Sequence, residues 1–136
     1  MTIIVDTGAL VALIDPDTAE HEWVRAQTRY LPRPLLTSEP VLTEAAFLLA
    51  RDGFDVDLLF ALAESGLLAV AITFAAEQKA FRALMRRYRQ LPMSLADASL
   101  VRLSELHDNS RILALDSDFR IYRRHGNKTI PVLMPD

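Results

Sequence analysis

Two acidic residues of this chain stand where carboxylates could act together. Asp6 directly follows the β-branched run Thr2–Val5, and Asp116 directly follows the apolar run Ile112–Leu115. Both runs are typical of buried strands. Binding sites in open parallel sheets form outside the carboxyl ends of the strands. If both strands are central in one sheet, Asp6 and Asp116 face the same crevice, although an Asp after a strand also suits a helix N-cap.

Two further acids interrupt apolar faces of predicted helices. Glu44 has Val41 and Leu48 as neighbours one turn away, and Asp97 likewise has apolar residues one turn ahead. A lone carboxylate on such a face is costly unless it is paired or bound to a metal. For Asp97 a capping box with Ser94 is an alternative that leaves one carboxylate oxygen free.

Four gathered carboxylates would repel one another and raise each other's pKa unless a cation neutralised them. The chain has no cysteine, and its histidines, His21, His107 and His125, lack the spacing of metal ligands, so zinc is disfavoured. An all-oxygen site suits Mg²⁺ or Mn²⁺, which bind through a few carboxylates, several waters and substrate phosphate. Such a site can activate water for in-line displacement at phosphorus. The four acids therefore predict metal-dependent phosphodiester hydrolysis.

The elements that must position these acids alternate along the chain. Strands are expected at residues 2–5, 35–37, 68–72, 112–115 and 130–133, and helices at residues 7–14, 18–31, 40–51, 56–64, 74–90, 95–107 and after Ser117. This alternation indicates parallel βαβ units and hence a three-layer α/β/α fold. Pro131 cannot donate to a sheet ladder, so the last strand is expected at an edge. No repeat or linker divides the chain, and we expect one domain over residues 1–136.

The net charge conceals an uneven distribution. The 136 residues carry 15 basic and 18 acidic side chains, a net charge of −3. Residues 1–78 hold four basic and twelve acidic side chains (−8), and residues 79–136 hold eleven and six (+5). Basic residues cluster at residues 79–89 and 120–128, either as solvated faces or as a surface for an anionic partner. If bound metal neutralises the four acids, the formal net charge of the chain changes from −3 to +1.

Composition also limits the location of the protein. The longest uncharged apolar stretch, Leu67–Ala76, is about half of the roughly 20 residues that a membrane span needs. No cationic segment of the signal-peptide type precedes Asp6. With cysteine absent as well, a cytoplasmic location without membrane contact is the expectation.

Taken together, these motifs resemble those of the PIN-domain ribonucleases, in particular the VapC-type toxins of bacterial toxin–antitoxin pairs. The resemblance extends over nearly the whole chain. It rests on Ile3–Leu10, on Glu44 within Leu42–Leu48, on Leu95–Ala98, and on Ile112–Phe119. It implies a five-stranded parallel sheet and a Mg²⁺- or Mn²⁺-dependent endonuclease that cuts RNA. It also implies a homodimer and a small antitoxin protein as partner.

The resemblance further assigns roles to individual residues. Asp6, Glu44, Asp97 and Asp116 would be the catalytic acids that hold the metal. Asp118 would lie beside the site as a further metal-binding group, through water. The substrate-binding candidates are Thr7, the small hydroxyl residue that follows the first acid, together with Ser117, Arg86 and Arg87. Arg86 and Arg87 belong to the first basic cluster.

Other functions of α/β domains fit these residues less well. A receiver domain needs an acidic pair at the first strand, where Val5 stands, and a haloacid-dehalogenase-type phosphatase needs an Asp where Gly8 stands. No glycine pattern of a nucleotide-triphosphate loop is present. The remaining alternative is a catalytically silent PIN-like module that binds RNA or protein. In either case Trp23, Tyr30, Tyr88 and Tyr122 are candidates for stacking on bases or for packing.

Overall fold

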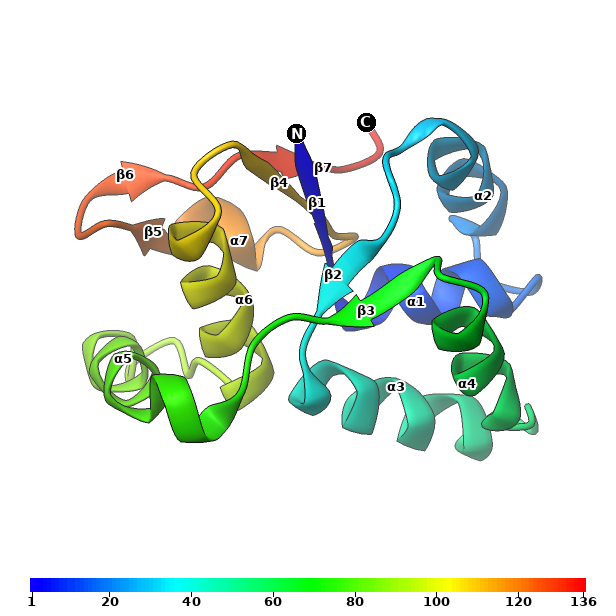
Figure 1. The fold of residues 1–136 in the computed structure, drawn as a ribbon, viewed down its shortest axis with the longest axis horizontal. Coiled ribbons are helices and arrows are strands. Elements are labelled where there is room, and N and C mark those ends of the chain that lie inside the picture. Colours follow the sequence, from blue (N-terminus) through cyan, green and yellow to red (C-terminus); the bar gives the residue numbers. More distant parts are fainter.

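The computed structural model describes all residues, 1–136, and is built around one five-stranded sheet (Figure 1). Its strands are β1 (Thr2–Val5), β2 (Leu35–Thr37), β3 (Leu68–Val70), β4 (Ser110–Leu113) and β7 (Val132–Leu133). They lie in the order β3-β2-β1-β4-β7, and every pair is parallel. The five-stranded parallel sheet is thus confirmed, and the strand with Pro131 before it does lie at an edge.

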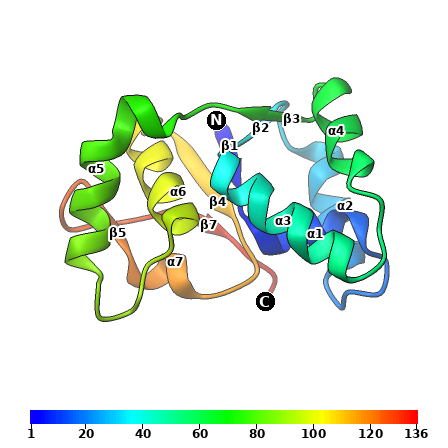
Figure 2. The same cartoon turned by 90° about the horizontal axis from the view of Figure 1, so that it is seen from below.

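Seven helices cover the sheet. They are α1 (Thr7–Ile14), α2 (His21–Tyr30), α3 (Glu39–Arg51), α4 (Asp57–Glu64), α5 (Phe74–Arg87), α6 (Leu95–Leu106) and α7 (Asp118–Ile121). Figures 1 and 2 show α1 to α4 grouped on one side and α5 to α7 on the other. This is the three-layer α/β/α arrangement expected when strands and helices alternate. The core between the layers includes Ile3, Ile4, Leu100, Ile112 and Leu113, all fully buried.

Strand β1 lies at the centre of the sheet, where the connections change direction. From β1 the chain moves outward to β2 and β3, then crosses back to β4 on the other side of β1. The register pairs Val5 with Leu113, and the Asp6 N–H continues the ladder by donating to the Leu113 carbonyl at 3.0 Å. In open α/β sheets a crevice forms at the carboxyl ends of two strands that diverge in this way.

Polar caps fix where the helices near that crevice begin. The side chains of Ser38, Thr73 and Ser94 accept hydrogen bonds from backbone N–H groups in the first turns of α3, α5 and α6. Each cap satisfies a donor that the helix itself leaves unpaired. The Ser38 and Ser99 hydroxyls also lie 2.6 Å apart, and this contact joins the start of α3 to α6.

The structure adds one element that the sequence did not predict. Strands β5 (Arg123–Arg124) and β6 (Lys128–Thr129) form an antiparallel hairpin within the second basic cluster. Its turn contains His125 and Gly126, both with positive φ. The strands have two residues each and lack the apolar alternation by which strands are recognised. The other helices and strands begin or end within three residues of the predicted positions. For example, α2 begins at His21 and α5 ends at Arg87.

No helix in the chain combines the length and the apolar character that crossing a membrane requires.

Candidate active site

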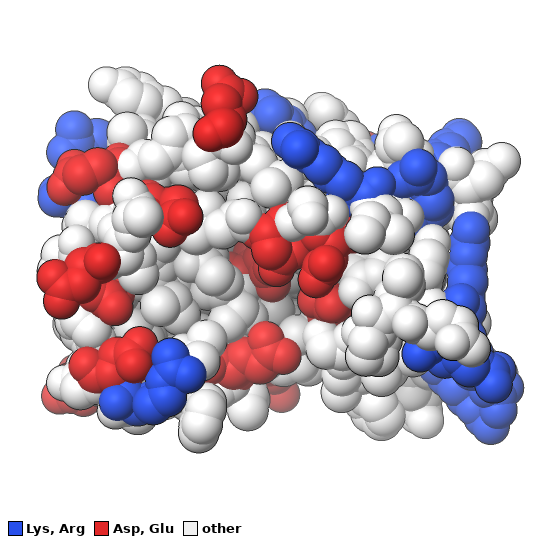
Figure 3. Space-filling model, turned by 180° about the vertical axis from the view of Figure 1, so that it is seen from behind, with Lys and Arg blue, Asp and Glu red and all other residues white.

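Five acidic side chains from five different elements surround the carboxyl ends of β1 and β4. Asp6 ends β1, Glu44 lies in α3, Asp97 in the first turn of α6, Asp116 after β4 and Asp118 in the first turn of α7. Acidic side chains gather in the middle of the face shown in Figure 3. Asp6 is close enough to Asp116, Asp97 and Glu44 to be repelled by their charges, and Asp118 is repelled by Asp116 and Asp97, so the structure brings together every acidic residue selected from the sequence.

Asp6 lies deepest in the group. It is only 6% exposed, and its Oδ1 accepts a hydrogen bond of 2.7 Å from the Thr7 N–H, so it caps α1 as well as ending β1. Burial raises the pKa of Asp6 to about 7, and repulsion from Asp116, Asp97 and Glu44 adds to this, against the opposing Thr7 N–H. The capping role and a role in the acidic site are thus compatible, because Oδ2 has no protein partner.

Glu44 is placed differently from what the sequence predicted. The buried stripe of α3 runs through Val41, Ala45 and Leu49, and Glu44 lies outside it on the exposed side of the helix. The expectation of an acid on a buried apolar face was therefore wrong. Glu44 instead accepts a hydrogen bond of 3.0 Å at Oε2 from the Thr7 hydroxyl. This contact ties α3 to α1 and turns the Glu44 carboxylate toward the site.

Asp97 is held from two sides. Its backbone N–H donates to the Ser94 Oγ at 3.0 Å, and its Oδ2 accepts a hydrogen bond of 2.8 Å from the Tyr122 hydroxyl. Burial raises the pKa of Asp97, the hydrogen bonds from Tyr122 and Ser94 oppose the rise, and the negative charge of Asp116 adds to it. Burial and the bond to Asp97 also raise the pKa of Tyr122, so Tyr122 stays a neutral donor.

Sequence reasoning missed the part that Tyr122 plays in this arrangement. Tyr88 and Tyr122 were candidates for base stacking, but both are buried, with ring centroids 5.1 Å apart in an edge-to-face contact. They are therefore packing residues, and neither ring is free to stack on a base. Tyr122 lies 25 residues from Asp97, and no pattern in the sequence indicates that the two are in contact.

Asp116 and Asp118 form the exposed rim of the site. Asp116 Oδ1 accepts a hydrogen bond of 2.9 Å from the Asp118 N–H, which tightens the turn into α7. The N-cap of α7 is Ser117, and its exposed hydroxyl makes no bond to the protein. Partial burial, with repulsion from Asp116 and Asp97, raises the pKa of Asp118. Asp118 is therefore part of the crowded group of negative charges, and it is not the N-cap of α7.

No cation of the protein neutralises this group. The ion pairs of the chain join Arg51 to Asp52, Arg102 to Glu77 and Glu105, and His125 to Asp108, and none involves the five acids. The only buried unpartnered side-chain atoms are Ser110 Oγ and Arg124 Nε, so the free Oδ2 of buried Asp6 is open to solvent. The cluster is therefore negative and accessible from outside.

The donor set fits a hard divalent cation. Each of Asp6, Glu44 and Asp97 uses one carboxylate oxygen for a protein hydrogen bond and leaves the other free. No three acidic side chains lie close enough together here to hold one ion directly. Mg²⁺ usually keeps several waters and binds through one or two carboxylates, so it does not need such a cage. All-oxygen donors of this kind suit Mg²⁺ or Mn²⁺ better than zinc.

The order of these elements matches a known family. The chain matches the PIN domain over residues 3–124, which include all five acids. The chain belongs to the PIN-domain family. This PIN domain is also similar in structure to VapC20 of Mycobacterium tuberculosis, described as a toxin that cleaves the sarcin–ricin loop, with a TM-score of 0.75 and 26% identity. The match covers 86% of this chain and 92% of that one. A search of curated proteins found no significant match.

The basic residues of this PIN domain lie to one side of the acids. Lys and Arg side chains gather at the end of Figure 3 where α5 and the β5–β6 hairpin are found. Arg86 and Arg87, the substrate-binding candidates, are both exposed in the last turn of α5. Arg87 lies over the Tyr88 ring, 5.1 Å from its centroid, whereas Arg86 lines a cavity that it shares with Phe74. The two arginines therefore face different surroundings.

Proposed function

We propose that this PIN domain is a Mg²⁺- or Mn²⁺-dependent endoribonuclease that hydrolyses RNA phosphodiester bonds as the toxin of a toxin–antitoxin pair. The observation that carries the proposal is the gathering of five acids with free oxygens and no cationic partner. A divalent ion bound there supplies an acidified water as the nucleophile and neutralises charge on the phosphate. Membership of the PIN-domain family and likeness to a VapC toxin support the same activity.

In this proposal Asp6, Asp97, Asp116 and Asp118 hold the ion, one or two of them through a carboxylate oxygen directly and the others through its bound waters. Asp6 is its most buried ligand and must lose its proton for the ion to bind, since its pKa lies near 7 without metal. Tyr122 keeps Asp97 in place by donating to Oδ2, which leaves Oδ1 as the oxygen that would be available to the ion. Ligand-orienting bonds of this type commonly alter metal affinity or activity about 10- to 100-fold when removed.

Glu44 is the remaining catalytic acid. It is exposed and is oriented by Thr7, so its free oxygen can accept a proton from the attacking water or bind a water of the ion. Thr7 acts as a positioning residue, because its hydroxyl hydrogen is given to Glu44. Ser117, whose hydroxyl has no protein partner, and Arg86 contact the substrate phosphates.

The partners follow from the same resemblance. We infer a homodimer, a small antitoxin protein that inhibits the toxin, and a cytoplasmic site of action on RNA. The first RNA to test is a sarcin–ricin loop, because VapC20 is described as cleaving that loop.

Growth of bacteria that express the chain tests activity, site and toxin role together. We expect wild-type expression to arrest growth and to fragment RNA, and Asp97→Asn to restore growth at equal protein level. Glu64→Gln, an exposed acid at the end of α4, is the matched control and should remain toxic. Healthy growth with abundant soluble wild-type protein contradicts the toxin assignment. RNA that is bound by the purified chain but not cut favours the silent binding module instead.

A further inference from the structure

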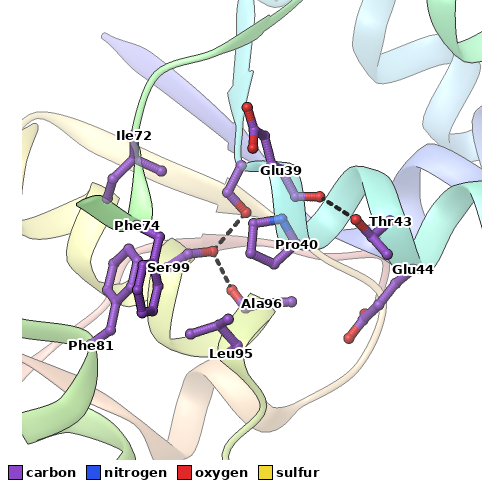
Figure 4. A pocket seen from close by; sticks show the side chains of 11 residues that line it. Glu39, Pro40, Thr43, Glu44, Ile72, Phe74, Phe81, Leu95, Ala96 and Ser99 are labelled. Carbon is purple, nitrogen blue, oxygen red and sulfur yellow. Dashed lines mark hydrogen bonds between the residues drawn. The ribbon is translucent and has the colours of Figure 1, made fainter. Parts of the chain in front are cut away.

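A cavity of about 400 Å³ opens directly beside Glu44, between the starts of α3, α5 and α6. Figure 4 shows Pro40 and Glu44 on one side of it and Phe74, Phe81 and Leu95 on the other. This cavity is separate from the gathered aspartates, but Glu44 belongs to both places. A molecule that lies in the cavity would therefore reach the edge of the acidic site.

The polar groups at the base of this cavity are already satisfied by the protein. The Ser99 hydroxyl donates to the Ala96 carbonyl at 2.6 Å, and the Ser38 hydroxyl, 2.6 Å from it, accepts the N–H of Val41. These hydroxyls join α3 to α6 and need no ligand. Apart from the exposed carboxylates of Glu39 and Glu44 on the α3 side, the cavity presents an apolar wall to a ligand.

Phe74 is the unusual member of that wall. Phe74 is 57% exposed, whereas Phe81, two helical turns further on, is 2% exposed and belongs to the core. The two ring centroids are 6.2 Å apart with planes tilted by 52°, so Phe81 supports Phe74 from behind. Large aromatic surface left in water is unfavourable unless something covers it. Phe74 is thus a fixed aromatic surface that is open on one side.

A second cavity, of about 560 Å³, shares Phe74, Phe81 and Leu95 with the first. Its remaining wall carries three arginines of α5 and the residues after it: Arg82, Arg86 and Arg89. None of the three has an acidic partner within 4.0 Å, and the Arg89 Nε donates only to the Arg86 carbonyl. Unpaired guanidinium groups at this spacing attract an anion and suit phosphate oxygens.

We propose that these two cavities form one furrow that binds a nucleotide of single-stranded RNA next to the cleavage point. Its base would stack on Phe74, and its phosphates would contact Arg82, Arg86 and Arg89. Along the furrow the acids come first, then the ring of Phe74, and then the arginines. In a single RNA strand the scissile phosphate, the neighbouring base and the next phosphate follow one another in the same order. Base stacking on aromatic rings above a positively charged groove is how proteins commonly hold single strands. This inference rests on the proposed function.

The test measures RNA binding to the Asp97→Asn chain, which should not cut its ligand. A fluorescently labelled single-stranded oligoribonucleotide is titrated with this chain and with chains that also carry Phe74→Ala, Phe74→Leu or Phe74→Tyr. Stacking on one aromatic ring corresponds to a change in Kd of about 5- to 150-fold. We expect Ala and Leu both to weaken binding by that factor and Tyr to restore it to within about twofold, because Leu keeps apolar area but not a ring.

The arginines are tested through salt dependence. On single strands each neutralised phosphate contributes about 0.7 to the slope of log K against log salt. Arg82→Ala, Arg86→Ala and Arg89→Ala should each reduce that slope by about this amount. Arg29→Ala, an exposed arginine of α2 on the far side of the sheet, is the control and should leave the slope unchanged.

The outcomes separate this inference from the proposed function. If the wild-type chain cleaves RNA and Phe74→Ala changes neither Kd nor KM, the furrow is not the nucleotide site, while the nuclease assignment stands. If Phe74→Ala weakens RNA binding and sedimentation shows that the variant has dissociated into monomers, the loss of binding follows from the loss of the dimer. Phe74 would then be an interface residue between two copies, and the inference would be wrong. If the wild-type chain neither binds nor cuts RNA, both are overturned.

Discussion

The hydroxyl of Tyr122 donates a 2.8 Å hydrogen bond to Oδ2 of Asp97, and so couples the end of α7 to the first turn of α6. Tyr122 is itself held by edge-to-face contacts with Tyr88 and Phe119, at 5.1 and 5.7 Å between centroids. The orientation of one carboxylate at the proposed metal site thus depends on the packing of an aromatic cluster in the layer of α5 to α7.

Removal of that hydroxyl should weaken the site without unfolding the protein. Tyr122→Phe keeps the buried ring and its aromatic contacts but leaves Asp97 Oδ2 without its donor. We expect Mn²⁺ affinity or the cleavage rate to fall about 10- to 100-fold, as for other groups that orient metal ligands. Titration calorimetry with Mn²⁺ and a cleavage assay measure the two effects. Tyr30→Phe, at an 87% exposed position, is the control. Equal affinity and rate in Tyr122→Phe and wild type would exclude a positioning role.

The metal-free protein should lose stability as pH rises from about 4 to about 7. Asp6 has a pKa of about 7 when folded, against 3.8 for an ordinary Asp, so over this range the folded state binds the proton that the unfolded state releases. The stabilisation is fully present below about pH 4 and lost by about pH 7. The pKa difference corresponds to about 4 kcal/mol for Asp6 alone. The raised pKa of Asp97 acts in the same direction.

Asp6→Asn isolates the contribution of Asp6 to this pH dependence. Asn still caps α1 through its side-chain oxygen but carries no charge at any of these pH values. Urea unfolding in the presence of chelator should therefore show a much flatter pH profile for Asp6→Asn. The variant should also be more stable than wild type at about pH 8 without metal. Parallel profiles for the two proteins would mean that Asp6 is not the group that titrates.

Metal binding should depend on pH for the same reason. Because the ion displaces the proton of Asp6, Mn²⁺ affinity should increase up to about tenfold per pH unit below about pH 7 and level off above it. At a concentration 100 times its Kd, the ion should stabilise the fold by about 2.7 kcal/mol. Titration calorimetry at several pH values and thermal unfolding with and without Mn²⁺ measure these effects. The same thermal shift in Asp6→Asn and in wild type would place the bound metal elsewhere.

Thr7 should matter for rate through Glu44. Thr7→Val has nearly the same shape but lacks the hydroxyl that donates to Glu44 at 3.0 Å, so the Glu44 carboxylate loses its fixed orientation. We expect kcat to fall about tenfold with KM little changed, and Thr7→Ser to retain most of the activity. Steady-state cleavage kinetics provide the test. A loss of activity in Thr7→Ser as large as in Thr7→Val would point to packing of the methyl group instead.

Local patterns in the sequence predict most of the fold. The β-branched run at residues 2–5, the caps Ser94 and Thr73, and the alternation of strands and helices all appear in the structure as expected. The convergence of the acids was predictable too, because parallel strands end at the same edge. These features depend on residues close in sequence or on general rules of connection.

Features set by contacts between distant residues were not predictable. Glu44 is exposed because the buried face of α3 runs through Val41 and Ala45. Which face of α3 is buried depends on its packing against α1 and α6, and helical spacing alone does not determine it. Tyr122 meets Asp97 only through the fold. The exposure of Phe74 is likewise a property of the fold, in which no other element covers this side chain.

Metal-dependent cleavage of RNA by the purified protein is the decisive measurement for the proposed nuclease activity. The measurement is the initial rate of cleavage of an end-labelled sarcin–ricin loop RNA at increasing Mn²⁺, for wild type, Asp97→Asn and the control Glu64→Gln. We expect a saturable dependence on Mn²⁺ for wild type and Glu64→Gln, abolition by chelator, and a rate at least about 100-fold lower for Asp97→Asn. Cleavage that persists in chelator, or that is equally fast in Asp97→Asn and wild type, would contradict the proposal.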